Sequence, residues 1–236
     1  MNVYTTSNMQ YSITINNREF PIVIRRHATS KRMVVRYQPL QSCVTLTLPR
    51  YVPIKQGVAF VHSKQQWLEN QIDTHPQRTE FSDGKTIPIL GQNYMVRHVG
   101  GRGVVEKTAD EILVHGDAAF MERRLRAWII ARVREEIAAR AQEKAAAIGK
   151  KFTKISMRDN SSCWGSCNRL GHLSFSWRLI FAAPEILDYV VAHEVAHLAH
   201  LDHSKAFWNV VAQLCPHWEH SRHWLKTHGK TLYAFG

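Results

Sequence analysis

The 236-residue sequence has little cysteine and no long apolar run, and each of these absences excludes a class of protein. The cysteines Cys43, Cys163, Cys167 and Cys215 are scattered, so they do not predict the disulfide framework of a small secreted domain. No apolar stretch approaches the roughly 18 residues that a transmembrane helix requires. The first residues lack a basic segment followed by an apolar one, so we expect no secretory signal. These features predict a cytoplasmic protein without a membrane span.

Two further motifs are incomplete. The glycines around Arg102 are not followed by Gly-Lys-Ser/Thr and a helix start, so they predict a hairpin turn instead of a phosphate-binding loop. Gly165-Ser166-Cys167 does not match the Gly-x-Ser-x-Gly nucleophile elbow. The sequence therefore favours neither a P-loop nucleoside triphosphatase nor a serine hydrolase.

Acidic residues are scarce relative to basic ones: 19 Asp and Glu stand against 31 Lys and Arg, for a net charge of +12. Such a charge attracts nucleic acid, nucleotides or acidic polypeptides, but it also arises when basic side chains simply solvate exposed faces. The densest cluster alternates with apolar residues, as on the outer side of an amphipathic helix, and comprises Arg123, Arg124, Arg126, Arg132 and Arg134. No nucleic-acid-binding motif accompanies it, so a nucleic-acid or nucleotide partner stays open.

The pattern of apolar residues predicts an α+β protein with a β-rich N-terminal lobe (1–116) and a helix–strand–helix lobe (117–236). Strands are expected at 11–16, 20–26, 33–37, 43–48, 86–90, 94–99, 104–107 and 111–114, with one helix over 54–72. The second lobe is expected to hold a helix over 117–147, strands at 152–158 and 173–179 with a loop at 161–167 between them, and three later helices.

The most informative stretch is His193-Glu194-Val195-Ala196-His197. Residues four apart on a helix project from the same face, so both imidazoles can reach one metal ion. Glu194 lies about 100° further round the helix, close enough to hold a metal-bound water without becoming a ligand. Two ligands, a general base and an open position are typical of zinc hydrolases. We therefore predict one catalytic Zn²⁺, with His193 and His197 as ligands and Glu194 as the base.

A third ligand is less directly indicated. His200 falls on the same helical stripe, but it lies about 10.5 Å along the axis from His193, which makes a tetrahedral site awkward. His203 follows His197 by six residues, which allows the chain to turn back, and Asp202 can start that turn. His203 is favoured, and the alternatives are Asp202, His217, Glu219, His220 and His223.

Several motifs together resemble the YgjP-like metallopeptidase family, which is related to the SprT-like and WLM metalloproteases of the zincin fold. They are Trp164-Gly165-Ser166-Cys167, Ser176-Trp177-Arg178-Leu179, Pro184, Leu187-Asp188-Tyr189-Val190-Val191, His203-Ser204-Lys205-x-Phe207-Trp208 and Arg222-x-Trp224-Leu225, together with the His-Glu motif. The likeness is dense from about 120 to 228, with a weaker trace at Ser30-Lys31-Arg32. The resemblance implies that the two lobes can form one family domain over about 20–230.

The resemblance implies a zincin-type site with His193, His197 and His203 as ligands and Glu194 as base. It also implies that the strand near Ser174–Leu179 is the edge strand on which an extended peptide lies. One position departs from the family pattern, since Cys163 stands where members usually carry Arg. The resemblance therefore carries no role of that arginine over to position 163.

The hypothesis that follows is a zinc-dependent metallopeptidase acting on a peptide or protein substrate. Arg178, Tyr189 and the C-terminal histidines are candidates for stabilising the oxyanion. A metal-dependent nucleoside triphosphate pyrophosphatase or phosphohydrolase is the first alternative, because a metal site does not fix the electrophile. A basic nucleic-acid-associated module with a structural metal is the second, although a closed structural site has no use for Glu194.

Overall fold

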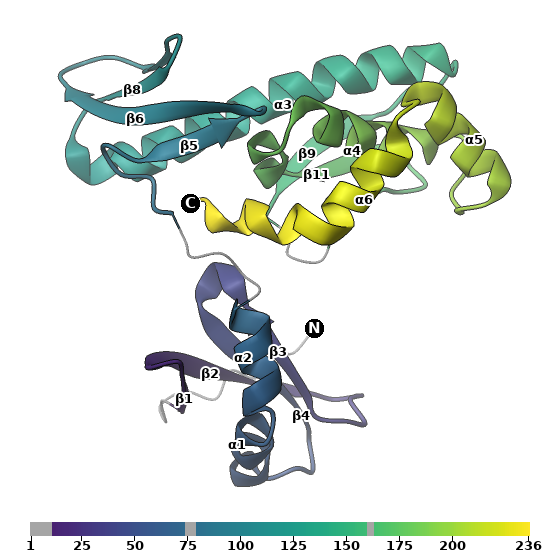
Figure 1. Cartoon of the computed structure of the whole chain (residues 1–236). Helices are drawn as coiled ribbons and strands as arrows, with labels where there is room; N and C mark the ends of the chain where they lie inside the picture. Colours follow the sequence, from purple (N-terminus) through teal and green to yellow (C-terminus); the bar gives the residue numbers. More distant parts are fainter. Residues whose placement is uncertain (1–10, 74–78, 160–162) are drawn as a thin grey trace. The chain divides into compact units, whose positions relative to one another are not determined.

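The structure is a computed structural model that describes residues 11–73, 79–159 and 163–236. It divides into two compact units, Met1–Pro76 and Gln77–Gly236, each with its own hydrophobic core (Figure 1). Strands and helices are mixed in both units, so the predicted α+β class is confirmed. No helix in the described part of the chain is long and apolar enough to cross a membrane.

The N-terminal unit is a four-stranded sheet with two helices. Its elements are β1 (Ser12–Ile15), β2 (Arg18–His27), β3 (Val34–Gln38), β4 (Cys43–Pro49), α1 (Ile54–His62) and α2 (Gln65–Asp73). The strand order is β1-β2-β4-β3, with β2 and β4 parallel and the other pairs antiparallel. Asn16 and Asn17 join β1 to β2 with φ of 50° and 59°, the left-handed conformation that a two-residue hairpin turn requires.

The single helix expected over 54–72 is wrong, because the chain forms two helices separated at Ser63 and Lys64. The Ser63 hydroxyl donates to the carbonyl of Phe60, a local bond that competes with the helical hydrogen-bond pattern. Leu68 of α2 and Val61 of α1 are both fully buried. Gly57 lets α1 approach the sheet, since a Cβ there would lie 2.6 Å from Leu48 Cδ2.

The C-terminal unit is organised along one long helix, α3 (Met121–Ala147). The strands β5 (Thr86–Ile89), β6 (Gln92–Gly100), β7 (Val105–Lys107) and β8 (Glu111–His115) form a sheet of order β5-β6-β8-β7. This sheet packs along the N-terminal half of α3, and α4 (Pro184–Ala196) packs along its C-terminal half (Figure 1). Every fourth residue of α3 from Leu125 to Ala145 is buried, so one continuous stripe serves both neighbours.

The division of the chain differs from the boundary expected at residue 116. Ile87, Val96 and Ile112 of the second sheet belong to the same buried cluster as Ile129 of α3 and Val191 of α4. Residues 79–116 are therefore part of the core that supports the His-Glu helix. Sequence pattern alone grouped them with the first sheet because both segments are rich in strands.

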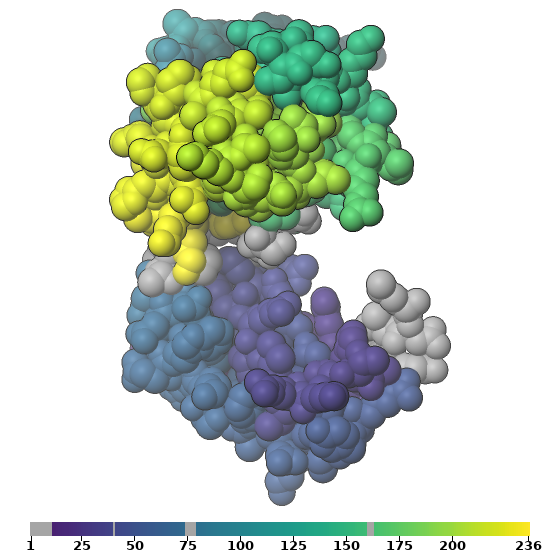
Figure 2. Space-filling model, turned by 90° about the vertical axis from the view of Figure 1, so that its right-hand side faces the viewer, coloured from purple at the N-terminus to yellow at the C-terminus, as the bar shows by residue number. Residues whose placement is uncertain are grey.

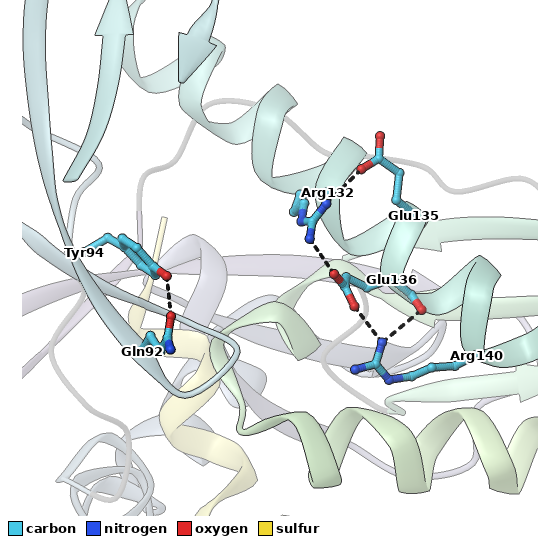
Figure 3. Close-up of polar contacts among 6 residues, drawn as sticks. All are labelled: Gln92, Tyr94, Arg132, Glu135, Glu136 and Arg140. Atoms are coloured by element: carbon cyan, nitrogen blue, oxygen red, sulfur yellow. Dashed lines mark hydrogen bonds and ion pairs between the residues drawn. The ribbon is translucent and has the colours of Figure 1, made fainter. Parts of the chain in front are cut away.

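Polar contacts hold α3 in place and neutralise part of its arginine cluster. Glu136 accepts from Arg132 and Arg140, at 2.6 Å each, one turn before and one turn after it on α3 (Figure 3). Arg126 pairs with Glu122 at 2.8 Å in the same i,i+4 spacing. Lys144 reaches Asp188 of α4 at 2.9 Å and so joins the two helices. Two of the clustered arginines, Arg126 and Arg132, thus form ion pairs within their own helix.

A small three-stranded sheet faces α4. Its strands are β9 (Lys154–Arg158), β10 (Gly165–Cys167) and β11 (His172–Ser176), in the order β10-β11-β9. The expected loop over 161–167 is wrong at its end, because 165–167 pair antiparallel with β11. The expected strand over 173–179 ends at Ser176, whose side chain accepts from the Arg178 N–H and caps the 3-10 helix η3 (Trp177–Phe181).

The last part of the chain consists of α5 (Lys205–Leu214), α6 (Trp218–His228) and the 3-10 helix η4 (Gly229–Ala234). In the space-filling view, the yellow-green and yellow segments that contain these helices form one continuous surface of the C-terminal unit (Figure 2). Both α5 and α6 pack against α4. The His-Glu helix is therefore enclosed by α3, the small sheet and the two final helices.

Candidate metal centre

The helix α4 carries the first two histidines of the candidate centre. Pro184 occupies its first turn, where a missing N–H costs nothing, and the helix continues to Ala196 with His197 as its C-cap. Val191 and Val195 are fully buried, which fixes the rotation of the helix about its axis. The last turn of α4 therefore holds His193 and the C-cap His197 on one face, as the four-residue spacing predicts.

His203 returns to the same point through the loop after α4. Ser204 is the N-cap of α5 and accepts from the Phe207 N–H, while Asp202 Oδ1 accepts from the Ser204 N–H at 3.2 Å. These bonds start α5 directly after His203 and hold its side chain against α4. One nitrogen from each of His193, His197 and His203 lies within 4.8 Å of the other two.

The donor set fits a zinc ion. Nε2 of His193 lies 3.2 Å from Nε2 of His203. Two nitrogens at the usual zinc distance in a tetrahedral arrangement are about 3.3 Å apart, so this pair already has the required spacing. Nδ1 of His197 lies 3.0 Å from the carbonyl of His200, and donation there leaves the other ring nitrogen free to bind metal. A hydrogen bond from the other ring nitrogen to a backbone carbonyl is typical of metal-ligating histidines.

Burial keeps the imidazoles neutral and therefore able to act as ligands. It lowers the pKa of His193 to about 4, with smaller contributions from His197 and His203. The pKa of His197 is lowered as well, mainly by burial. Nδ1 of His193 is buried and has no hydrogen-bond partner within the described ranges. His193 is therefore held by packing, whereas His197 is held by packing and a hydrogen bond.

A phenylalanine that spacing did not single out packs against all three ligands. The ring of Phe207 on α5 lies 4.9 Å from that of His193, 4.5 Å from that of His197 and 4.8 Å from that of His203. Trp208 contacts the rings of His193 and His203 at 5.7 and 6.0 Å. The resemblance contained both aromatic residues, but their role as a common support for the ligands is visible only in the structure.

The other expected ligand candidates are not part of this group. His200 contributes its backbone carbonyl to His197, not its imidazole to the cluster. Asp202 is turned to the start of α5. His217, Glu219, His220 and His223 lie at or on α6, outside the group of three. The structure thus brings together the set that the resemblance implied.

Glu194 is a buried carboxyl group beside the cluster. Its side chain is 5% exposed, and among the described residues it has no ion pair or hydrogen bond. Burial raises the pKa of Glu194 to about 8, and a divalent cation nearby would favour its charged form. A buried, unpaired carboxyl group in a pocket is typical of a catalytic site.

Gly165 of β10 provides the space that Glu194 occupies. A Cβ at this position would lie 2.6 Å from both Cγ and Oε1 of Glu194. The carboxyl group is therefore placed where any other residue at 165 would put its side chain. The glycine of the Trp-Gly-Ser-Cys motif thus contributes to the site through its lack of a side chain.

A pocket of about 250 Å³ opens beside these groups. Its lining residues are Cys163, Trp164, Gly165, Tyr189, Val190, His193, Glu194, Arg222 and Leu225. Burial raises the pKa of Tyr189 to about 12, so its hydroxyl keeps its proton and remains a donor. Arg222 lies with its guanidinium 5.0 Å from the centre of the Trp208 ring. Cys163, the departure from the family pattern, is thus located in the wall of this pocket.

Arg178 does not belong to the site, although the sequence made it a candidate for oxyanion stabilisation. Its side chain is 1% exposed, and its Nε donates to Asp159 Oδ1 at 2.7 Å. It also donates to the carbonyl of Phe235 and lies 4.5 Å from the Trp177 ring centre. These contacts give Arg178 a structural role between η3 and the C-terminal segment.

The expected edge strand is also corrected. β11 is the central strand of the small sheet, because β10 and β9 pair on either side of it. The edge that adjoins the centre is β10, whose Gly165 contacts Glu194. The sequence missed this because a three-residue strand has no detectable periodicity.

Comparison with known families agrees with this geometry. The family described as "YgjP-like, metallopeptidase domain" matches residues 31–228, which is most of the chain. Among curated proteins and among solved structures, none matches.

Proposed function

The chain belongs to the YgjP-like metallopeptidase family, and we propose from this premise that it is a zinc-dependent peptidase. Family membership by itself points to a metal-dependent peptidase acting on peptides or proteins. The identity of the metal and the roles of single residues are our proposal. The observation that supports it most directly is the grouping of His193, His197 and His203 beside a buried, unpaired Glu194.

In this proposal the three histidines hold the ion and Glu194 transfers protons. A zinc ion would supply polarisation of the scissile carbonyl and acidification of a water molecule. Glu194 accepts the proton of the attacking water and then delivers it to the leaving amine. A carboxyl group whose pKa burial shifts toward neutrality is suited to both transfers.

The oxyanion needs a hydrogen-bond donor, and Tyr189 is the candidate that the structure favours. Tyr189 is four residues before His193 on α4, and both residues line the pocket that holds Glu194. Its hydroxyl has no protein hydrogen-bond partner within the described ranges and keeps its proton because burial raises its pKa. Arg222 lines the same pocket and adds positive charge.

An extended substrate has an edge strand available at this site. Among the strands of the described residues, β10 pairs with β11 alone, so we infer that the backbone groups on its other side can pair with a further strand. Gly165 of the same strand borders Glu194. A peptide added to β10 would therefore pass beside the general base.

The nucleotide alternative loses part of its basis in the structure. Part of its support was the arginine cluster of α3, and Arg126 and Arg132 of this cluster pair with glutamates of the same helix. The second alternative, a nucleic-acid-associated module with a structural metal, does not explain a buried carboxyl group beside the metal ligands. Cytoplasmic location remains a prediction, with which the four free cysteines are compatible.

The test is a parallel hydrolysis assay of wild-type protein and Glu194→Gln, each with its bound zinc quantified. A mixture of unstructured peptides and a set of nucleoside triphosphates serve as substrates. We expect peptide cleavage by the wild type and a loss of about 10²- to 10⁴-fold in the variant, because general acid–base catalysis contributes about this much. Zinc content should stay equal in both proteins.

Full peptidase activity of zinc-loaded Glu194→Gln would refute the role of the base. Hydrolysis of nucleotides without hydrolysis of peptides would refute the substrate class and select the first alternative. His203→Ala serves as the matched control for the ligand set, and it should lose zinc, whereas His200→Ala should keep it.

A further inference from the structure

A second pocket is lined by a different metal ligand, His197. It measures about 290 Å³ and is lined by Lys151, Asn168, Arg169, Leu170, Gly171, His197, Leu198 and Leu201. The first pocket contains Gly165 at the start of β10, and this one contains Asn168, directly after the strand ends at Cys167. The two pockets therefore lie at opposite ends of the edge strand, one beside His193 and the other beside His197.

The charges of the second pocket are unbalanced. Lys151 and Arg169 are both exposed, and in the described part of the chain neither has an acidic side chain within ion-pair distance. The carboxylate of Asp202, in the loop after α4, interacts electrostatically with His197. It is fully exposed, and it accepts a hydrogen bond from the Ser204 N–H. The pocket thus presents two cations to any occupant, next to a metal ligand.

The turn that carries Arg169 is fixed by hydrogen bonds. Oδ1 of Asn168 accepts from the N–H groups of Leu170 and His172, at 2.9 and 3.1 Å. The Thr153 hydroxyl donates to the Leu170 carbonyl at 2.8 Å. Gly171 has a φ of +70°, which an L-residue rarely adopts and which closes the turn. The backbone of Arg169 is therefore already ordered, and binding has to order its side chain alone.

Apolar side chains frame the two cations. Leu170 is 68% exposed and Leu201 is 53% exposed, and both line this pocket. Large exposed leucines beside a binding pocket are typical of surfaces that a partner covers. An occupant with an aliphatic stem and a terminal carboxylate would contact the leucines and pair with the cations.

We propose that this pocket is a substrate subsite for a carboxylate-bearing residue of the peptide chain. The proposal rests on the peptidase function, since the occupant is a peptide that extends along β10 across the metal centre. The carboxylate belongs to an Asp or Glu side chain or to the C-terminus of the substrate. The protein then prefers acidic peptides, in accord with its net charge of +12.

The test measures peptide binding to zinc-loaded Glu194→Gln by fluorescence anisotropy. Peptides carry Glu on either side of a central apolar pair, and matched peptides carry Gln at the same positions. We expect about three- to tenfold tighter binding of the Glu peptide at low salt, as for exposed ion pairs. Lys151→Glu with Arg169→Glu should abolish or reverse this preference, whereas Lys55→Glu with Lys64→Glu on the N-terminal unit should preserve it.

Peptides with a free or an amidated C-terminus distinguish the two sources of the carboxylate. Tight binding that persists in C-terminally amidated peptides identifies a side chain, and tight binding that needs the free acid identifies a terminal carboxylate. Equal affinity for Glu and Gln peptides, or a preference that survives the double charge reversal at 151 and 169, would overturn the subsite.

Failure of the subsite and failure of the peptidase function give different results. If wild-type protein cleaves peptides without any acidic preference, the subsite is wrong and the function stands. If wild-type protein cleaves no peptide but Glu194→Gln binds acidic ones through residues 151 and 169, the peptidase function is wrong and the pocket is a binding site for acidic peptides that are not substrates. Hydrolysis of nucleoside triphosphates that the double reversal abolishes would overturn both and assign the cations to phosphate.

Discussion

The two units of this protein use similar secondary structure but differ in what they bury. Each contains a four-stranded sheet packed against helices, and each core consists mainly of aliphatic and aromatic side chains. In the described part of the N-terminal unit, Thr45 is the buried polar residue. The C-terminal unit buries Ser174, Ser176, Arg178, Glu194 and Ser221. Burial of a polar or charged group is costly, so these buried groups require an explanation in the C-terminal unit that the N-terminal unit does not require.

Arg178 and Glu194 show that two different reasons apply within the C-terminal unit. Arg178 is fully paired, by Asp159 and by the carbonyl of Phe235, so its burial stabilises the packing of η3. Glu194 has no such partner in the described residues, and the space that it fills is left by a glycine. A buried charge with partners is consistent with structure alone, whereas a buried carboxyl group without them indicates chemistry.

Metal removal should produce the largest difference in thermal stability between the two units. Zinc that binds the folded C-terminal unit a thousandfold above its dissociation constant contributes about 4 kcal/mol. Chelation is therefore expected to lower the melting temperature of that unit by about 10 °C and to leave the N-terminal transition unchanged. Differential scanning calorimetry with and without chelator would measure both transitions. Equal shifts of the two transitions, or no shift of either, would contradict the assignment of the site to one unit.

Removal of the buried, paired charge of Arg178 should have the next largest effect on stability. Arg178→Met leaves Asp159 and the Phe235 carbonyl without their partner, so the free energy of unfolding should fall by about 3 kcal/mol. Urea unfolding of the chelated protein would measure this change.

Two matched variants sharpen the comparison with Arg178→Met. Arg25→Met, at an exposed position of the N-terminal unit, should change stability by less than about 0.5 kcal/mol. Glu194→Gln should not destabilise the metal-free protein, because it removes a group whose ionisation is unfavourable in its site. A comparable loss of stability in Glu194→Gln and Arg178→Met would remove the distinction between the two buried residues.

Gly165→Ala tests the space beside the base, with a smaller effect on stability. The added Cβ would collide with Glu194, so we expect a loss of about 1–2 kcal/mol and a fall in kcat of about 10²-fold at constant zinc content. In a Glu194→Ala background the same substitution should cost little stability, because the colliding atoms are gone. Ser166→Ala, the next residue of β10, is the control. An equal penalty in both backgrounds would show that Gly165 is required by the strand and not by Glu194.

The sequence predicted many of the elements that surround the site, and the misses have physical causes. Strands and helices with a clear period, such as β4 and α3, were found near their observed ends. The break at Ser63 was missed because a side-chain hydroxyl bonds locally to the Phe60 carbonyl, which leaves no trace in hydrophobic periodicity. The strand β10 was missed because its pairing partner is supplied by another segment.

At the candidate site, the sequence by itself determined the relation of His193, Glu194 and His197. A helix with 3.6 residues per turn places these three side chains relative to one another regardless of the rest of the chain. The tertiary structure decided which groups meet them. His203 reaches the cluster through a capped turn, Phe207 supports all three rings, and Gly165 admits the carboxyl group from a neighbouring strand. Contacts of this kind depend on register and packing between segments that are distant in sequence, and no local pattern encodes them.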